Sequence, residues 1–145
     1  MGIVGENGSG KSTIIKLLSK LCVPQSGMIY LDGIPIENLT YESVKRNIAV
    51  IPQDNFLPYG SLKSIMEINS KEKEKVMYEL MEKMGISIAK FPEGLNTEIS
   101  ENMGNLSGGE IQKLSLIRAL LQDKKIYILD EPTSAMDLES ESKFC

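Results

Sequence analysis

The sequence predicts an α/β fold, with a mainly parallel sheet around a glycine-rich loop and an inserted helical segment. Residues 5–12 match G-x-x-x-x-G-K-S/T between a predicted strand and a predicted helix. The apolar runs Ile48–Ile51 and Ile126–Leu129 are typical of strands that are covered on both faces of a sheet. Residues 61–90 are rich in Lys, Glu and Met and nearly free of strand signals, which indicates helices.

Composition excludes several classes of protein. The chain has 145 residues, enough for one domain with a real core. Its net charge of −4 argues against a general nucleic-acid or anionic-membrane binder. No apolar run is long enough to span a bilayer, and the N-terminus lacks a basic signal-peptide region. The two cysteines have no metal-type spacing, so we expect reduced cytosolic thiols. The sequence contains no histidine, which excludes a histidine base or metal ligand.

The first elements surround the glycine-rich motif. Ile3 and Val4 are predicted to end a buried strand that leads into it. A helix is predicted over residues 11–21, and Pro24 and Gly27 after it are expected to break the helical pattern. The helix has a broad apolar face, formed by Ile14, Ile15, Leu17, Leu18 and Leu21.

The next segment predicts a hairpin followed by a short helix. Residues 28–31 read as a strand, and Asp32-Gly33 is a strong turn signal before residues 34–36. Thr40 is predicted to cap a helix that runs through Arg46 into the strand at 48–51.

Two longer helices are predicted in the second half. The first covers Ser70–Met84, where Val76, Leu80 and Met84 recur at helical spacing, with Met77 and Met81 beside them. We interpret these methionines as core and the charged residues as a solvated face. The second covers Ser107–Leu121, before the strand at 126–129.

The glycine-rich loop has the chemistry of a phosphate site. Its glycines let backbone N–H groups wrap an anion, and the following helix adds its N-terminal partial positive charge. Lys11 places an ammonium on the outer phosphates, and the Ser12 hydroxyl is a suitable Mg²⁺ ligand. At the end of the 126–129 strand, Asp130 suits Mg²⁺ coordination, and Glu131 is placed to orient or deprotonate a water.

The segment Leu106-Ser107-Gly108-Gly109-Glu110 opens the last predicted helix. Ser107 and Glu110 have the spacing of a capping box, which explains a helix start without any ligand. The box leaves Gly108 and Gly109 unexplained, and bare backbone in a first turn suits contact with a terminal phosphate. Here the sequence resembles the ATP-binding cassette (ABC) family, whose signature is LSGGQ; Glu110 stands where the family usually has Gln.

Other motifs carry the same resemblance over essentially the whole chain. They are Walker A at 5–13, the Q-loop glutamine Gln53, Walker B at 126–130 and the D-loop at 134–137. Residues 52–62 and 92–101 resemble the Q-loop region and the segment before the signature in exporter-type cassettes, although Ser100, Asn102 and Met103 depart from that pattern.

The resemblance implies ATP and Mg²⁺ as cofactors and a role for each matching residue. Glu131 activates the attacking water, with Lys11 and Gln53 as the other catalytic residues. Mg²⁺ is held by Ser12, Gln53 and Asp130. ATP is contacted by Asn7, Gly8, Ser9, Gly10, Lys11, Ser12 and Thr13, and from a second cassette by Ser107, Gly108 and Gly109.

The resemblance also implies partners. Two nucleotide-binding domains form a head-to-tail homo- or heterodimer on the membrane domain of an ABC exporter, at the cytoplasmic face of the cell membrane and without nucleic acid. The chain is then a P-loop NTPase core (residues 1–59 and 106–145) with a helical subdomain (residues 60–105). The family's adenine-stacking aromatic residue and switch histidine do not occur in the sequence, so we expect a cassette truncated at both ends, without its flanking strands.

Two alternatives stay open. The chain by itself could bind nucleotide weakly without hydrolysing it, because those two family parts are missing. A soluble ABC ATPase of DNA repair or chromosome organisation also shares the signature, but such chains carry a long coiled coil between Walker A and the signature, and no heptad pattern lies there in this sequence.

Overall fold

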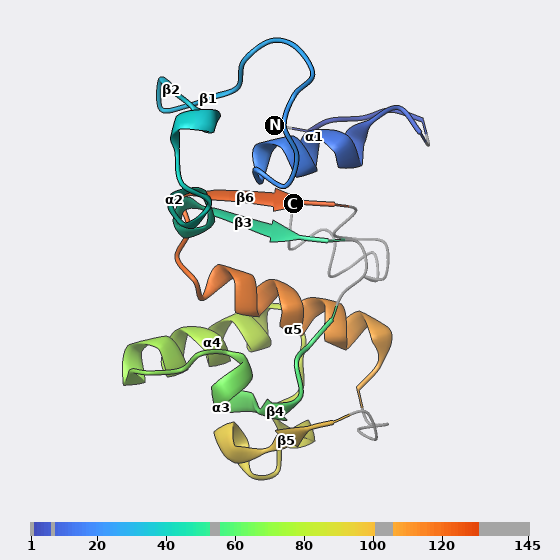
Figure 1. Ribbon diagram of the computed structural model, residues 1–145. Coiled ribbons are helices and arrows are strands. Elements are labelled where there is room, and N and C mark those ends of the chain that lie inside the picture. The colour runs from blue at the N-terminus through green and yellow to red at the C-terminus, as the bar shows by residue number, and fades with distance from the viewer. Residues whose placement is uncertain (1, 7, 53–55, 101–105, 131–145) are drawn as a thin grey trace. The chain divides into compact units, whose positions relative to one another are not determined.

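A computed structural model describes residues 2–6, 8–52, 56–100 and 106–130 of the chain (Figure 1). The described residues form two compact units: unit 1 comprises those within 2–50 and 124–130, and unit 2 comprises those within 51–123. The α-helices are α1 (Lys11–Leu18), α2 (Tyr41–Asn47), α3 (Leu62–Ile65), α4 (Lys71–Lys83) and α5 (Gly108–Leu120). The 3₁₀ turns are η1 (Ile36–Asn38), η2 (Ile88–Lys90) and η3 (Gly94–Asn96). The strands are β1 (Tyr30–Leu31), β2 (Ile34–Pro35), β3 (Ile48–Ile51), β4 (Gly60–Ser61), β5 (Glu98–Ile99) and β6 (Ile126–Leu129).

Helix α1 of unit 1 ends earlier than predicted. Lys20 adopts a left-handed conformation with φ of 56° just beyond the helix. The N–H groups of Lys20 and Leu21 donate to the carbonyls of Leu17 and Lys16, at 3.0 and 2.8 Å. These two bonds form a Schellman motif, which closes the helix before Leu21 and leaves that side chain exposed.

The predicted strand at Ile3 and Val4 is wrong. These residues are irregular, and the Val4 side chain is 98% exposed. Within the part of the chain that the structure describes, no strand pairs with them. A short apolar segment becomes a strand only when a neighbour accepts its backbone hydrogen bonds, so the pattern alone did not suffice.

The predicted hairpin is confirmed in a shorter form. Strands β1 and β2 pair antiparallel, with Leu31 opposite Ile34. Asp32 and Gly33 between them have φ of 50° and 76°. Positive φ at both central residues is the condition for a type I′ turn, which Asp-Gly favours.

The remaining part of unit 1 is a small sheet with its own core. Thr40 caps α2 as predicted, since its Oγ1 accepts from the Ser43 N–H at 3.1 Å. Strands β3 and β6 pair and point in the same direction, which confirms a parallel arrangement (Figure 1). The β3 strand is mostly buried, whereas β6 is only partly buried, so full cover on both faces is not confirmed for β6. The buried core of this unit contains Ile36, Val44 and Ile48.

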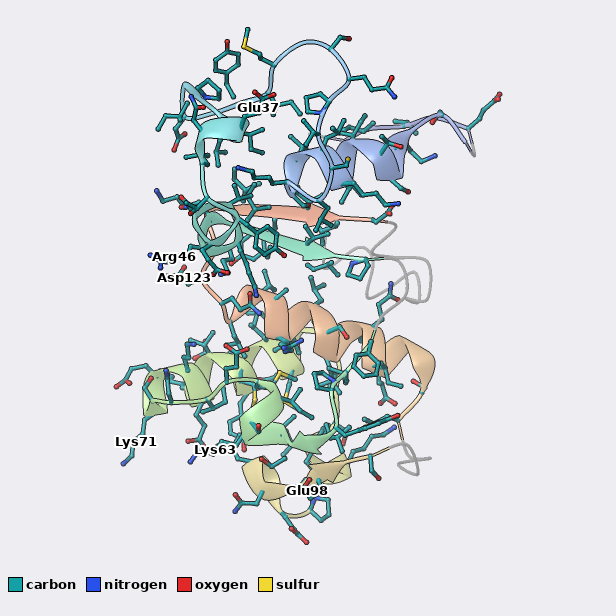
Figure 2. The ribbon with its side chains drawn as sticks, viewed as in Figure 1. Glu37, Arg46, Lys63, Lys71, Glu98 and Asp123 are labelled. Carbon is teal, nitrogen blue, oxygen red and sulfur yellow. The ribbon has the colours of Figure 1, made fainter. Side chains whose placement is uncertain are left out.

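Unit 2 is built mainly from helices. Strands β4 and β5 pair antiparallel and bring Ser61 opposite Glu98. Charged side chains such as Lys63, Lys71 and Glu98 lie on its exposed surface (Figure 2). Its core gathers residues from α3, α4, α5 and the segments between them, among them Leu62, Met66, Met77, Met81, Leu114 and Ile117. Among the described residues, no helix combines the length and apolar character needed to cross a bilayer.

Helix α4 confirms its predicted position but turns a different face inward. Met77 and Met81 are completely buried, whereas Val76 is 45% exposed. Leu80 and Met84 are partly buried at the edge of the same core. The inward face is therefore centred on the two methionines, whose flexible side chains fill irregular space between helices.

Met77→Ala is expected to destabilise unit 2 by roughly 2–5 kcal/mol, because it leaves a cavity in a packed core. The neighbouring Val76→Ala is a matched control on the same helix and should stay within about 0.5 kcal/mol of the parent, because Val76 is largely exposed. Chemical denaturation followed by circular dichroism measures both. Equal losses for the two variants would contradict this assignment of the buried face.

Candidate functional site

Two glycines of the glycine-rich loop adopt backbone conformations that other residues rarely adopt. Gly8 and Gly10 have φ of 83° and 95°, in the region that residues with a side chain rarely adopt. A Cβ on Gly5 would lie 2.6 Å from Ser9 Oγ, so the Ser9 side chain would have to turn away to admit it. The Ser9 N–H donates to the Glu6 carbonyl at 3.1 Å and closes the turn. The sequence is therefore folded locally into a tight loop that ends at the start of α1.

Lys11 is the first residue of α1 and reaches back over this loop. Its Nζ donates to the carbonyls of Gly5 and Glu6 at 2.7 and 3.0 Å. The ammonium thus lies against the loop backbone, at the helix end that carries partial positive charge. The loop and the helix start together offer a cationic side chain and first-turn N–H groups that have no partner within the helix, a combination of the kind that binds phosphate.

Three oxygen-bearing residues accompany the loop in unit 1. Ser12 and Thr13 are exposed in the first turn of α1, and Asp130 follows β6 and is half-buried. The loop before α1 and the carboxyl ends of β3 and β6 lie at the same side of unit 1 in Figure 1. A hydroxyl and a carboxylate are hard oxygen donors, so the donor set fits Mg²⁺.

Other predicted site residues lie outside the described residues. They are Asn7, Gln53 and Glu131, together with the whole D-loop at 134–137. Their predicted roles stay predictions.

The signature segment lies in unit 2, at the start of α5. Ser107 is the N-cap residue, and the predicted capping box is confirmed: Ser107 Oγ accepts from the Glu110 N–H at 3.3 Å, and Glu110 Oε2 accepts from the Ser107 N–H at 2.9 Å. Gly108 has no heavy atom within 4 Å of the place where a Cβ would be, beyond its own surroundings in the helix. The space around position 108 therefore does not require glycine there.

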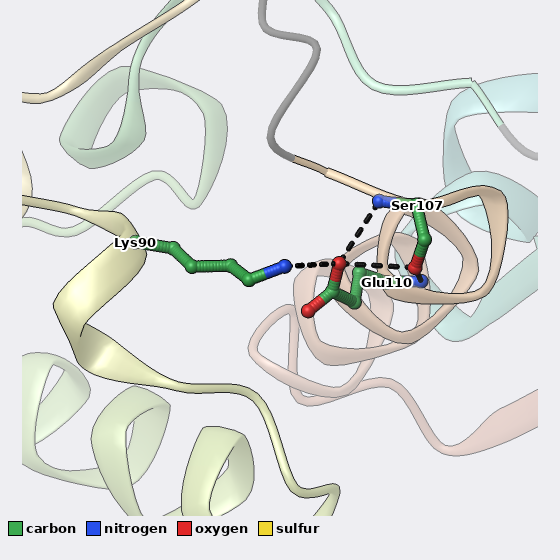
Figure 3. A network of polar contacts seen from close by, with 3 residues as sticks. All are labelled: Lys90, Ser107 and Glu110. Carbon is green, nitrogen blue, oxygen red and sulfur yellow. Dashed lines mark hydrogen bonds and ion pairs between the residues drawn. The ribbon is translucent and has the colours of Figure 1, made fainter.

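Sequence reasoning missed Lys90, the last residue of η2. Its Nζ lies 2.8 Å from Glu110 Oε2, so the carboxylate of the capping box is also half of an ion pair (Figure 3). No sequence pattern connects these residues, which are 20 positions apart. Only the Glu in place of the family's Gln hinted that a compensating cation was needed.

The hydrogen bonds around Glu110 change its acidity. Burial raises the pKa of Glu110, but the hydrogen bonds from Lys90 and Ser107 outweigh it and hold the pKa below the ordinary value of 4.5. A depressed pKa in the folded state means that the contribution to stability is complete above 4.5 and is lost as the pH falls through the folded value.

The chain is similar to ATP-binding proteins of exporters. It is 36% identical over 148 residues to an uncharacterized ABC transporter ATP-binding protein, YfiB of Bacillus subtilis, covering 99% of this chain and 26% of that protein. It is 39% identical over 145 residues to the ATP-dependent lipid A-core flippase of Xylella fastidiosa, covering 96% and 24%. The mitochondrial iron–sulfur clusters transporter ABCB7 of Homo sapiens is 36% identical over 140 residues, covering 94% and 19%.

A solved structure confirms the predicted fold. The chain matches a bacterial Atm1-family ABC exporter with ATP bound at a TM-score of 0.81 and 31% identity, covering 95% of this chain and 25% of that one. The chain thus spans about a quarter or less of the length of these relatives. The model of the family described as ABC transporter matches residues 1–134. By this match and by its relatives, the chain belongs to the ABC transporter family, as the phosphate-binding loop and the signature segment predicted.

Proposed function

We propose that this chain binds MgATP and hydrolyses it as the nucleotide-binding part of an ABC exporter. The observation that carries the proposal is the loop in front of α1. Two left-handed glycines, Gly8 and Gly10, shape a backbone cradle, and the ammonium of Lys11 lies across it. In a chain of this family, whose relatives include an exporter solved with ATP bound, that cradle suits the phosphates of ATP.

The residues of the loop bind the nucleotide electrostatically. Backbone N–H groups from Asn7 to Thr13 surround the β- and γ-phosphates, with the Ser9 side chain beside them, and Lys11 neutralises part of their charge. To do so, the Lys11 ammonium exchanges its hydrogen bonds to the carbonyls of Gly5 and Glu6 for bonds to phosphate oxygens. These bonds to a charged ligand are the stronger ones.

Ser12, Gln53 and Asp130 would hold the Mg²⁺, with Asp130 acting through water. When bound, Mg²⁺ neutralises charge on the phosphate oxygens as the γ-phosphoryl group is transferred. Glu131 accepts a proton from the attacking water. The water oxygen then forms the new bond to phosphorus, and the bond from phosphorus to the ADP oxygen breaks.

The signature segment completes the site of a second domain. Ser107, Gly108 and Gly109 at the start of α5 contact the γ-phosphate of ATP that is held by the loop of a partner in a head-to-tail dimer. The dimer drives a membrane-spanning partner, so the protein works at the cytoplasmic face of a membrane. The helical subdomain, residues 60–105, transmits the nucleotide state to that partner.

Gly108→Ala tests the role of the signature. Alanine fits at this position and favours a helix, so the free energy of unfolding should stay the same or rise by up to about 1 kcal/mol. ATP turnover should nevertheless fall roughly tenfold or more, because the methyl group displaces phosphate from backbone N–H groups and costs hydrogen bonds to a charged ligand. Phosphate release by the full-length transporter, together with its thermal unfolding, measures both effects.

The informative result for Gly108→Ala is a lower ATP turnover together with an unchanged or higher free energy of unfolding. Unchanged turnover would contradict a phosphate contact at residue 108. Lower stability would mean that the glycine serves the fold.

A further inference from the structure

Glu110 is held by an unusual set of contacts for a helix-capping residue. A single oxygen, Oε2, accepts from the Ser107 N–H at 2.9 Å and from Ser107 Oγ at 3.0 Å, and lies 2.8 Å from Lys90 Nζ (Figure 3). The side chains of Lys90 and Glu110 are only 34% and 17% exposed. Partial burial reduces screening by water and salt, so this pair interacts more strongly than a fully exposed one.

The cap itself does not need Lys90. Ser107 and Glu110 supply both hydrogen bonds of the capping box by themselves. A glutamine at position 110 would accept the same bonds through its amide oxygen but would carry no charge. Lys90 therefore adds a positive charge. This charge offsets the negative charge that Glu110 carries and that a glutamine would lack.

That charge matters for an anionic ligand at the start of α5. The partial positive charge of a helix N-terminus favours both an acidic side chain in the first turn and a bound phosphate. Without a neighbouring cation, the negative charge of the Glu110 carboxylate would cancel part of the positive potential at the helix N-terminus and would repel an incoming phosphate. With the Lys90 ammonium in contact, the net charge of the pair is zero, as it is for a glutamine.

We propose that Lys90 is a positioning residue: its ammonium neutralises the Glu110 carboxylate, so that the start of α5 can bind the terminal phosphate of ATP without repulsion from Glu110. The inference rests on the proposed function, since it assumes that Gly108 and Gly109 face a nucleotide. It adds a residue from η2 to a site otherwise built on α5.

The test is a double-mutant cycle in the full-length transporter. Lys90→Met should raise the KM for MgATP by about tenfold while kcat changes much less, because it leaves a like charge facing the phosphate. Glu110→Gln leaves the Lys90 ammonium unopposed and should lower the KM by up to about tenfold, because the pair then carries a net positive charge. The double variant of Lys90→Met and Glu110→Gln is again neutral, so its KM should lie within about twofold of the parent. Lys63→Met, at an exposed lysine of α3, is the matched control and should leave KM unchanged.

Two further variants separate charge from folding. Lys90→Arg keeps the charge and should behave like the parent, while Lys90→Gln keeps a hydrogen-bond donor without charge and should behave like Lys90→Met. These variants decide the question even where Lys90→Met unfolds. If Lys90→Met does not raise the KM with Glu at position 110, or if the double variant stays as impaired as Lys90→Met alone, the proposal is overturned. Lys11→Ala in the same assay reports on the proposed function separately, because turnover insensitive to Lys11 would remove that function itself.

Discussion

Glu131→Gln is expected to abolish ATP turnover while ATP stays bound. Glutamine has nearly the shape of glutamate but cannot accept a proton from the attacking water, so the loss should be on the order of 10²–10⁴-fold. Binding should persist, because the phosphates are held by the loop in front of α1 and by Lys11 rather than by residue 131. Single-turnover phosphate release and retention of labelled ATP on the full-length transporter measure the two effects.

Glu42→Gln provides the matched control for this substitution. Glu42 is an exposed carboxylate in the first turn of α2, so its neutralisation should leave both turnover and ATP retention unchanged. If Glu131→Gln still hydrolyses ATP at the parent rate, the assignment of the base is wrong. If it loses bound ATP as well, residue 131 acts in binding instead.

Lys11→Ala is expected to weaken ATP binding and to remove turnover. Its ammonium is the cationic side chain that lies on the loop backbone, at 2.7 Å from the Gly5 carbonyl. Each charge-assisted bond that it makes to phosphate is worth about 1.5–3 kcal/mol, so losing two of them should weaken binding by a factor of 100 or more, on the order of 3–6 kcal/mol. Equilibrium titration with a fluorescent ATP analogue measures the change.

Lys16→Ala on the exposed side of the same helix is the control for Lys11→Ala, and it should bind ATP like the parent. Equal binding by the Lys11 and Lys16 variants would contradict a phosphate-binding role for Lys11. The same titration, made on the 145-residue chain alone, tests the alternative that this chain binds nucleotide weakly without hydrolysing it. Sustained hydrolysis by the chain, lost in Lys11→Ala, would exclude that alternative.

Features that depend on near neighbours in the sequence were predicted well. The Asp32-Gly33 turn and the Thr40 cap appear where expected. The Ser107–Glu110 capping box appears as well. Each joins atoms of residues no more than three positions apart, so composition and spacing determine it directly. The glycine-rich loop belongs to the same class, because its left-handed glycines directly precede the helix α1.

Features that depend on distant partners were predicted less well. The apolar Ile3 and Val4 suggested a strand, but the described chain gives them no strand to pair with. Helix α4 has several apolar residues around it, and the packing against α3 and α5 selects Met77 and Met81 for the interior. A helical pattern limits the buried face to a broad arc, and only the neighbouring elements fix its centre.

The sequence by itself determined the family and the α/β class and predicted the chemistry of the loop, because these follow from motifs whose residues are close together in the chain. The tertiary structure alone brought Lys90 from η2 to within 2.8 Å of Glu110 at the start of α5. An ion pair between residues 20 positions apart forms only when the fold brings their elements together. For that reason, the sequence showed Glu110 only as a substitution for the family's glutamine, whereas the structure shows that it forms a neutral ion pair with Lys90.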